Sequence, residues 1–173
     1  MSQIASFYVL PGNRVVDLIG AATPKQITTK SRSLGFIPVT KTERKDYFWD
    51  FLKANARKLD EFGFSGSVLC ELDLFLSDTH AMLFDLAVKQ PTEQLSSIRA
   101  TSMALFDHVS AQKVLDMLSK VDCTPESIRR HCETEESYWS SDELIEPLRA
   151  AVAQTKLWMS GVGPADTGLL IVG

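Results

Sequence analysis

Apolar residues gather in short blocks along the chain, and their spacing predicts its helices and strands. Residues 4–10 form an apolar, partly β-branched run that Pro11 ends, which is typical of a buried strand. Asn13 can cap a following helix, whose apolar positions repeat at helical spacing as far as Ala22. Residues 169–172 near the other end are an unbroken apolar block, which favours a strand buried on both faces.

The middle of the chain contains the most regular helical pattern. Apolar residues repeat at helical spacing over residues 44–62, and they predict one long helix that Gly63 ends. Residues 68–76 fit both a helix and a strand, because periodicity does not separate the two in so short a run. Residues 80–88 have helical spacing that stops before Pro91.

Other segments have weaker patterns. Residues 23–43 show no clear period and are rich in Ser, Thr, Pro and Gly, so a long loop is predicted. A short extended piece is predicted within residues 98–106. Three further helices are predicted from start signals at Ser110, Thr124 and Ser140, although Pro147 lies so deep that the last helix either begins or bends there.

These elements predict the fold class. We expect one α+β domain over residues 1–173, with a small sheet that contains the N- and C-terminal strands and is flanked by helices. The residues on the predicted inner faces are Phe48, Phe51, Leu52, Leu59, Val114, Leu118, Leu148, Val152, Leu170 and Ile171.

Composition and charge narrow the classes of function. The chain has 173 residues, is 45% hydrophobic and carries a net charge of −4, which argues against nucleic acid as its main partner. Its three cysteines cannot all pair within one chain, which fits a reducing compartment. A signal peptide and a run long enough to span a membrane are both lacking. We therefore expect a cytoplasmic protein that binds neither nucleic acid nor membranes.

Charge is unevenly distributed along the chain. Residues 25–45 hold six basic residues and one acidic residue, whereas residues 133–146 hold six acidic residues and no basic one. The two segments either face each other, dock partners of opposite charge, or form ordinary solvated surface. Tyr138 and Trp139 lie inside the acidic segment, where an aromatic pair is either a core anchor or a binding hot spot.

Few residues suggest catalysis. Glu71 and Asp73 would lie about 7 Å apart on one face if their segment is a strand, and could then act as acid and base. As solvated surface residues they would have no catalytic role, and this is the stronger expectation. Cys123 precedes a predicted helix, whose amide dipoles could lower the pKa of its thiol. His131 and Cys132 do not share a zinc-site spacing with Cys123, so no metal site and no cofactor are expected.

Several pieces recur in the order of one known family. They are the N-terminal strand and helix over residues 4–22, the Asp-Tyr-Phe-Trp-Asp-Phe-Leu run at residues 46–52, the helix that opens after residues 108–110, and the final strand. In this the chain resembles the YfbM-like family of bacterial proteins, a domain of unknown function. The resemblance implies a mixed α/β fold in a small bacterial cytosolic protein. Lys53 stands where members often have histidine, and the resemblance supplies no catalytic residues.

The sequence therefore favours a non-enzymatic, protein-binding module. Its acidic segment would steer a partner with a basic surface, and Tyr138 and Trp139 would anchor that partner. Asp46, Trp49 and Asp50 of the aromatic run are candidates for a pocket. The alternative is a small hydrolase or transferase that uses Cys123, or the pair of carboxylates at Glu71 and Asp73.

Overall fold

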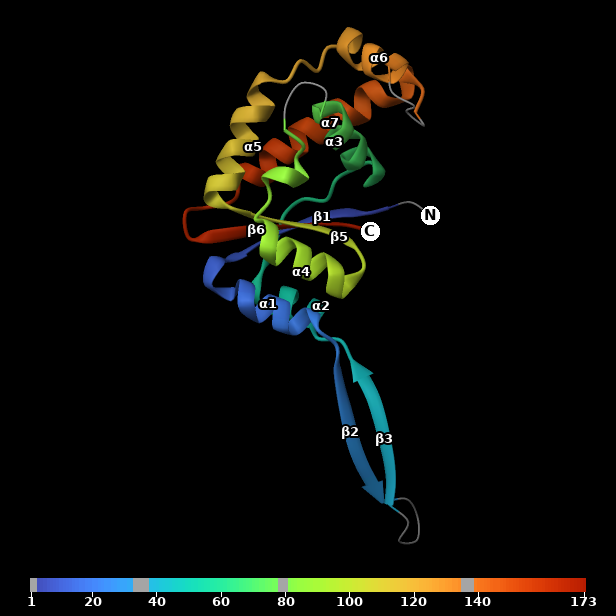
Figure 1. The fold of residues 1–173 in the computed structure, drawn as a ribbon, viewed down its shortest axis with the longest axis vertical. Helices are drawn as coiled ribbons and strands as arrows, with labels where there is room; N and C mark the ends of the chain where they lie inside the picture. Colours follow the sequence, from blue (N-terminus) through green and yellow to red (C-terminus); the bar gives the residue numbers. More distant parts are fainter. Residues whose placement is uncertain (1–2, 33–37, 78–80, 135–138) are drawn as a thin grey trace.

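Two strands from opposite ends of the chain pair at the centre of the structure, a computed structural model (Figure 1). The structure describes residues 3–32, 38–77, 81–134 and 139–173, with the backbone alone described for residues 29–32 and 38–40. Strands β1 (Ala5–Pro11) and β6 (Asp166–Val172) run antiparallel along their whole length. The prediction that one sheet contains both terminal strands is confirmed, and the structure shows in addition that these two strands pair with each other.

The sheet has four antiparallel strands in the order β4-β1-β6-β5. Strand β4 (Arg57–Lys58) forms one short edge beside β1, and β5 (Ser102–Asp107) forms the other edge beside β6. Single 3₁₀ turns occur at Gly12–Arg14 and Phe84–Leu86.

Helices cover both faces of this sheet, so the α+β prediction is confirmed (Figure 1). One face packs on α1 (Val15–Ala22), α2 (Phe48–Asn55) and α4 (Lys89–Arg99). The other face packs on α3 (Ser67–Ser77), α5 (His108–Lys120) and α7 (Ser141–Ser160), with α6 (Pro125–Thr134) against α7.

Strand β6 faces both cores. Leu170 and Val172 pack in the cluster beneath α3, α5 and α7, while Leu169 and Ile171 pack in the cluster beneath α1, α2 and α4. Successive side chains of a strand point to opposite faces, so an unbroken apolar run serves two cores at once. The predicted core residues are buried, except that Phe51 and Leu59 are half-buried.

The outer edge of β5 is covered by side chains of α4. The hydroxyl of Ser96 accepts a hydrogen bond from the Met103 N–H at 3.2 Å and donates one to the Met103 carbonyl at 3.1 Å. The Thr92 hydroxyl accepts from the Leu105 N–H at 2.9 Å, and the Val88 N–H donates to the Leu105 carbonyl at 2.8 Å. Backbone groups that would otherwise be open to another strand are thereby satisfied.

The sequence pattern does not predict helix α4, because Pro91 is typical of a position where a helix stops. Pro91 is the third residue of the helix, where its missing N–H has no acceptor within the helix in any case. The ambiguous segment at residues 68–76 is helical, and the start signal at Thr124 is confirmed by the bond from the Ser127 N–H to the Thr124 hydroxyl. Helix α7 begins at Ser141 and continues through Pro147.

The helix predicted over residues 44–62 is shorter, since α2 ends at Asn55 and the chain enters β4. Phe48 and Leu52 pack in the cluster beneath α1, α2 and α4, whereas Phe62 packs in the opposite cluster. The apparent single apolar face therefore belongs to two segments on different sides of the sheet.

The loop predicted over residues 23–43 is wrong. Strands β2 (Lys25–Arg32) and β3 (Pro38–Lys45) pair antiparallel along eight residues each and form an arm, which projects away from the body (Figure 1). We call these two strands the basic arm. Because the arm is not packed on a core, its sequence lacks the apolar alternation by which strands are recognised.

Removing the hydroxyl that covers β5 tests this account of the sheet edge. We expect Ser96→Ala to lower the free energy of unfolding by about 1–3 kcal/mol, since both backbone groups of Met103 lose their partner. Ser97→Ala, at an exposed position of the same helix, is the matched control and should change stability little. Equal losses in the two variants, measured by urea unfolding, would contradict the edge-covering role.

Candidate functional site

Two hollows flank helix α3 on the surface. The first has a volume of about 730 Å³ and lies between α3, the 3₁₀ turn at Phe84, α4 and the start of β5. The residues of α3 that line it are Cys70, Asp73 and Leu74. The others are Phe84, Thr92, Ser96, Ala100, Thr101, Ser102 and Met103.

The second hollow lies on the other side of α3 and has a volume of about 620 Å³. Cys70 and Leu74 line both hollows, so they form a ridge between them. Leu74 is 47% exposed, which is high for a large apolar side chain. The remaining residues that line the second hollow are Ser67, Glu71, Trp139 and Glu143.

A buried carboxyl group forms part of the first hollow. Asp73 is only 6% exposed, and its Oδ1 accepts a hydrogen bond from the Phe84 N–H at 3.2 Å. Burial raises the pKa of this carboxyl, while backbone hydrogen bonds from Phe84 and Leu83 act in the opposite direction. Asp73 forms no ion pair with any described residue. A cation brought by a ligand or partner would therefore be stabilised here.

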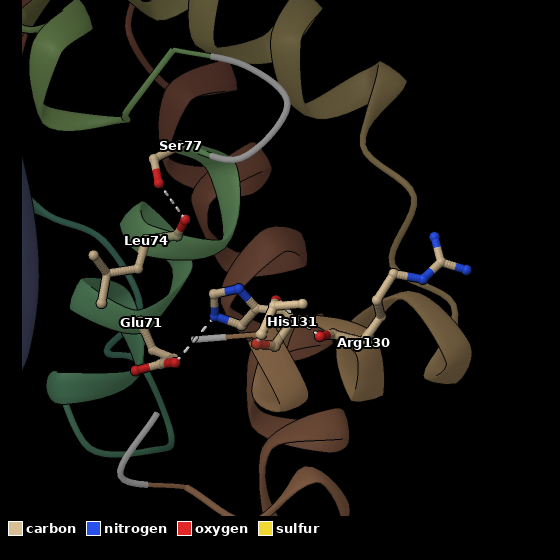
Figure 2. A network of polar contacts seen from close by, with 6 residues as sticks. Glu71, Leu74, Ser77, Arg130 and His131 are labelled. Atoms are coloured by element: carbon tan, nitrogen blue, oxygen red, sulfur yellow. Dashed lines mark hydrogen bonds and ion pairs between the residues drawn. The ribbon is translucent and has the colours of Figure 1, made fainter. Parts of the chain in front are cut away.

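Glu71, unlike Asp73, contacts a histidine side chain. Its Oε1 lies 3.1 Å from Nε2 of His131 on α6, and both side chains are buried (Figure 2). The edge of the His131 ring also meets Phe75, with ring centroids 5.3 Å apart. The Leu74 side chain points away from this pair, toward the surface (Figure 2). The pair thus links α3 to α6 beneath the second hollow.

The two carboxylates considered as an acid–base pair are not brought together. Their segment is helical, so residues two positions apart point in different directions, one toward α6 and one toward the Phe84 turn. The expectation that Glu71 and Asp73 are solvated surface residues is also wrong, since both are buried. The contact with His131 of α6 accounts for the burial of Glu71, and the contact with the Phe84 turn accounts for that of Asp73.

The structure places Cys123 in a half-buried position against the core cluster. Burial raises the pKa of the Cys123 thiol, which is the opposite of the shift that a reactive cysteine needs. Burial and the charges of Asp73 and Glu71 likewise raise the pKa of the Cys70 thiol. Cys70 and Cys123 are present as free thiols.

The pocket candidates Asp46, Trp49 and Asp50 lie around α2 but do not share one pocket. Asp46 accepts a hydrogen bond from the Phe48 N–H at 3.0 Å and pairs with Arg99 of α4 at 2.7 Å. These contacts lower the pKa of the Asp46 carboxyl. Trp49 is 52% exposed and lines a separate hollow of about 290 Å³, while Asp50 is exposed.

Of the two aromatic residues proposed as an anchor, Tyr138 lies outside the described residues. Trp139 is half-buried, packs against the core cluster and lines the second hollow. The two charged segments do not face each other, because the basic arm and the N-terminal end of α7 lie at opposite ends of the molecule (Figure 1).

Within the part of the chain that is described, no three histidine, cysteine or acidic side chains gather in a way that could hold a metal ion. None of the helices formed by those residues combines the length and the apolar character needed to cross a bilayer.

The hollows beside α3 were not predicted from the sequence. In the sequence, Leu74 and Cys70 cannot be distinguished from the other apolar residues of their segment. Their positions beside the hollows depend on where α4 and α7 pack around α3. The one available signal was the pair of acidic residues inside an otherwise apolar run, which is uncommon in a buried helix.

Comparisons of this chain with protein-family models, with curated proteins and with solved structures find no significant match. Its function is therefore inferred from the residues of these hollows.

The burial of Asp73 has a consequence for stability. A folded-state pKa above the unfolded one means that the native protein holds this proton to higher pH than the unfolded chain does. The contribution of Asp73 to the free energy of unfolding is therefore greatest below about pH 3.9, and it falls as the pH rises through the folded-state pKa.

Replacing Asp73 by asparagine removes this titration while keeping an oxygen that accepts from the Phe84 N–H. We expect the stability of Asp73→Asn relative to the wild type to increase as the pH rises from about 4 to 7. Urea unfolding at several pH values measures this difference. A difference that stays constant, or that changes in favour of the wild type, would contradict the assignment.

Proposed function

We propose that this protein is a non-enzymatic module that binds a protein partner with a basic surface through the two hollows beside α3. The observation that carries the proposal is the position of Leu74. It stands exposed between two hollows, with Trp139 on one side and the buried Asp73 carboxyl on the other. Apolar anchors beside partly desolvated charges are typical of binding hot spots.

The charges around the hollows support a basic partner. Glu143 lines the second hollow, and Asp142 and Glu146 lie exposed on the same helix. The Ser140 hydroxyl donates to the Glu143 carboxylate at 2.6 Å, which holds that carboxylate at the rim of the hollow. Acidic groups at a rim attract a basic surface and guide its approach, while the apolar ridge supplies contact area.

A cationic side chain of the partner is proposed to enter the first hollow. A lysine or arginine has an apolar stem, which fits Leu74, Phe84 and Met103, and a cationic head, which fits the carboxylate of Asp73. The buried carboxylate of Asp73 favours a cationic side chain, because a buried carboxylate costs free energy unless a cation compensates its charge.

The cysteine and carboxylate hypotheses for an enzyme gain no support from the geometry. Raised thiol pKa values disfavour Cys70 and Cys123 as nucleophiles, and Glu71 and Asp73 point apart. The free thiols of Cys70 and Cys123 support a further part of the proposal, a location in the reducing cytoplasm. Descent from the YfbM-like family is likewise proposed, supported by the terminal strands that pair in one sheet.

The two exposed or half-exposed tryptophans provide a matched test. Affinity capture from the native host should yield a basic protein that is retained by the wild type and by Trp49→Ala. We expect Trp139→Ala and Leu74→Asp to lose that protein, and its retention to weaken as salt rises from about 50 to 300 mM because the steering charges are screened.

Circular dichroism of each variant serves as the fold control. Loss of the captured protein with Trp49→Ala as well as with Trp139→Ala would contradict the assignment to the hollows of α3. Retention by both Trp139→Ala and Leu74→Asp would contradict it equally.

A further inference from the structure

The basic arm concentrates positive charge on an acidic protein. Its segment, residues 25–45, holds six of the 18 basic residues of the chain but only one of the 22 acidic residues. A strand of eight residues spans roughly 26 Å, which exceeds the Debye length of about 8 Å at physiological ionic strength. The backbone of the arm therefore extends well beyond the distance over which the charges of the body act.

The register of the arm places like charges together. Lys25 lies directly opposite Lys45, and both side chains are exposed. Like charges at opposite positions of an antiparallel pair are destabilising, so an anion bound between them would relieve a repulsion that is built into the fold. Arg44, beside Lys45 and opposite Gln26, adds a third cation at the same end of the arm.

The composition of the arm distinguishes between anionic partners. Half of the non-basic residues of the two strands carry hydroxyl groups, and those of Thr28 and Thr42 are joined across the strands at 3.4 Å. Lysine, arginine, threonine, serine and glutamine are the side chains that contact phosphate groups. The strands contain no aromatic residue, although aromatic residues are enriched among the anchors that bind protein partners. Phosphates are therefore favoured over carboxylates.

A hollow at the foot of the arm adds an aromatic surface. It has a volume of about 410 Å³, between α1 and α2, and Lys25, Tyr47 and Phe51 line it. The Lys45 ammonium lies 5.0 Å from the centre of the Tyr47 ring. The acidic residue in this hollow, Asp17, pairs with Arg14 at 3.1 Å, so its charge is compensated.

From these features we infer that the foot of the basic arm and the hollow beside it bind single-stranded nucleic acid, with phosphates at Lys25, Arg44 and Lys45 and one base against Tyr47. The net charge of −4 predicts the opposite, but it is an average over the whole chain and does not describe this local concentration of basic residues. A basic track combined with aromatic rings is the usual means of holding single strands. A duplex keeps its bases stacked inside and could not place one in the hollow. This inference is independent of the hollows beside α3, because the hollow at the foot of the arm shares no lining residue with either of them.

The inference can be tested with the full chain and a fluorescein-labelled oligo-dT of about 20 nucleotides, followed by fluorescence anisotropy. Lys25→Gln with Lys45→Gln should weaken binding and reduce its salt dependence. The slope of log affinity against log salt concentration should be smaller by about 1.4 in the double variant, because it makes two fewer phosphate contacts. Between about 50 and 200 mM salt, the wild type should therefore lose roughly sevenfold more affinity than the variant does.

Matched controls separate this site from general charge effects. Lys89→Gln with Lys113→Gln removes the same charge from exposed positions of α4 and α5, and should leave binding nearly unchanged. Tyr47→Leu should weaken binding by about fivefold or more, whereas Tyr47→Phe should retain it.

Four results would overturn the inference. They are an absence of saturable oligo-dT binding at low salt, equal losses in the arm and control pairs, a duplex of the same length that binds as tightly, and unchanged binding in Tyr47→Leu. A fall in oligomeric mass on changing Lys25 and Lys45, with no effect on oligo-dT, would instead assign the arm to contacts between copies of this chain.

Discussion

The structure depends on the contact of three residues at the centre of the sheet: Phe7, Trp158 and Gly168. The ring of Phe7 stacks flat on Trp158, with ring centroids 5.4 Å apart and an angle of 8° between the planes. The Phe7 ring also lies against Gly168 of β6, where a Cβ atom would come within 2.3 Å of it. The indole N–H of Trp158 donates to the Asp60 carbonyl at 2.9 Å. One packed unit therefore joins β1, β6, α7 and the chain that follows β4.

This central contact determines where the candidate surfaces lie. Trp158 fixes the C-terminal part of α7, and the same helix carries Glu143 near its beginning, beside the second hollow. Helix α3 packs on α7 and thereby presents Leu74 between the two hollows. On the opposite face, α1 and α2 support the basic arm at its foot. The hollow at the foot of the arm lies on the face of the sheet that packs on α1 and α2, whereas the second hollow lies beside α3 and α7 on the opposite face.

The sequence predicted those helices and strands whose apolar residues repeat at a regular spacing because they face a core. The terminal strands and helix α5 were predicted, because their apolar residues face cores on one or both sides. Apolar spacing failed where it continued by coincidence from Phe48 to Phe62 across two cores. Apolar spacing also failed for the basic arm, because the sequence of its two strands is mostly polar and shows no alternation of apolar and polar residues.

The candidate sites were less predictable than the fold. Trp139 was identified because an aromatic residue stands out in an acidic segment, and the structure places it beside a hollow. The role of Asp73 depends on distances between α3, the Phe84 turn and β5, which no local pattern specifies. The pairing of Glu71 with His131 joins residues 60 positions apart and was equally invisible in the sequence.

Native-state hydrogen exchange tests the central claim most directly. If the paired terminal strands are the centre of the fold, the amides of residues 7–9 and 169–171 should exchange only when the whole protein unfolds. The amides of residues 26–28 and 41–44 should exchange far faster, although they too belong to paired strands, because a two-stranded arm without a core is only marginally stable. Exchange of the β6 amides as fast as those of the basic arm would contradict the account, as would an arm as protected as β6.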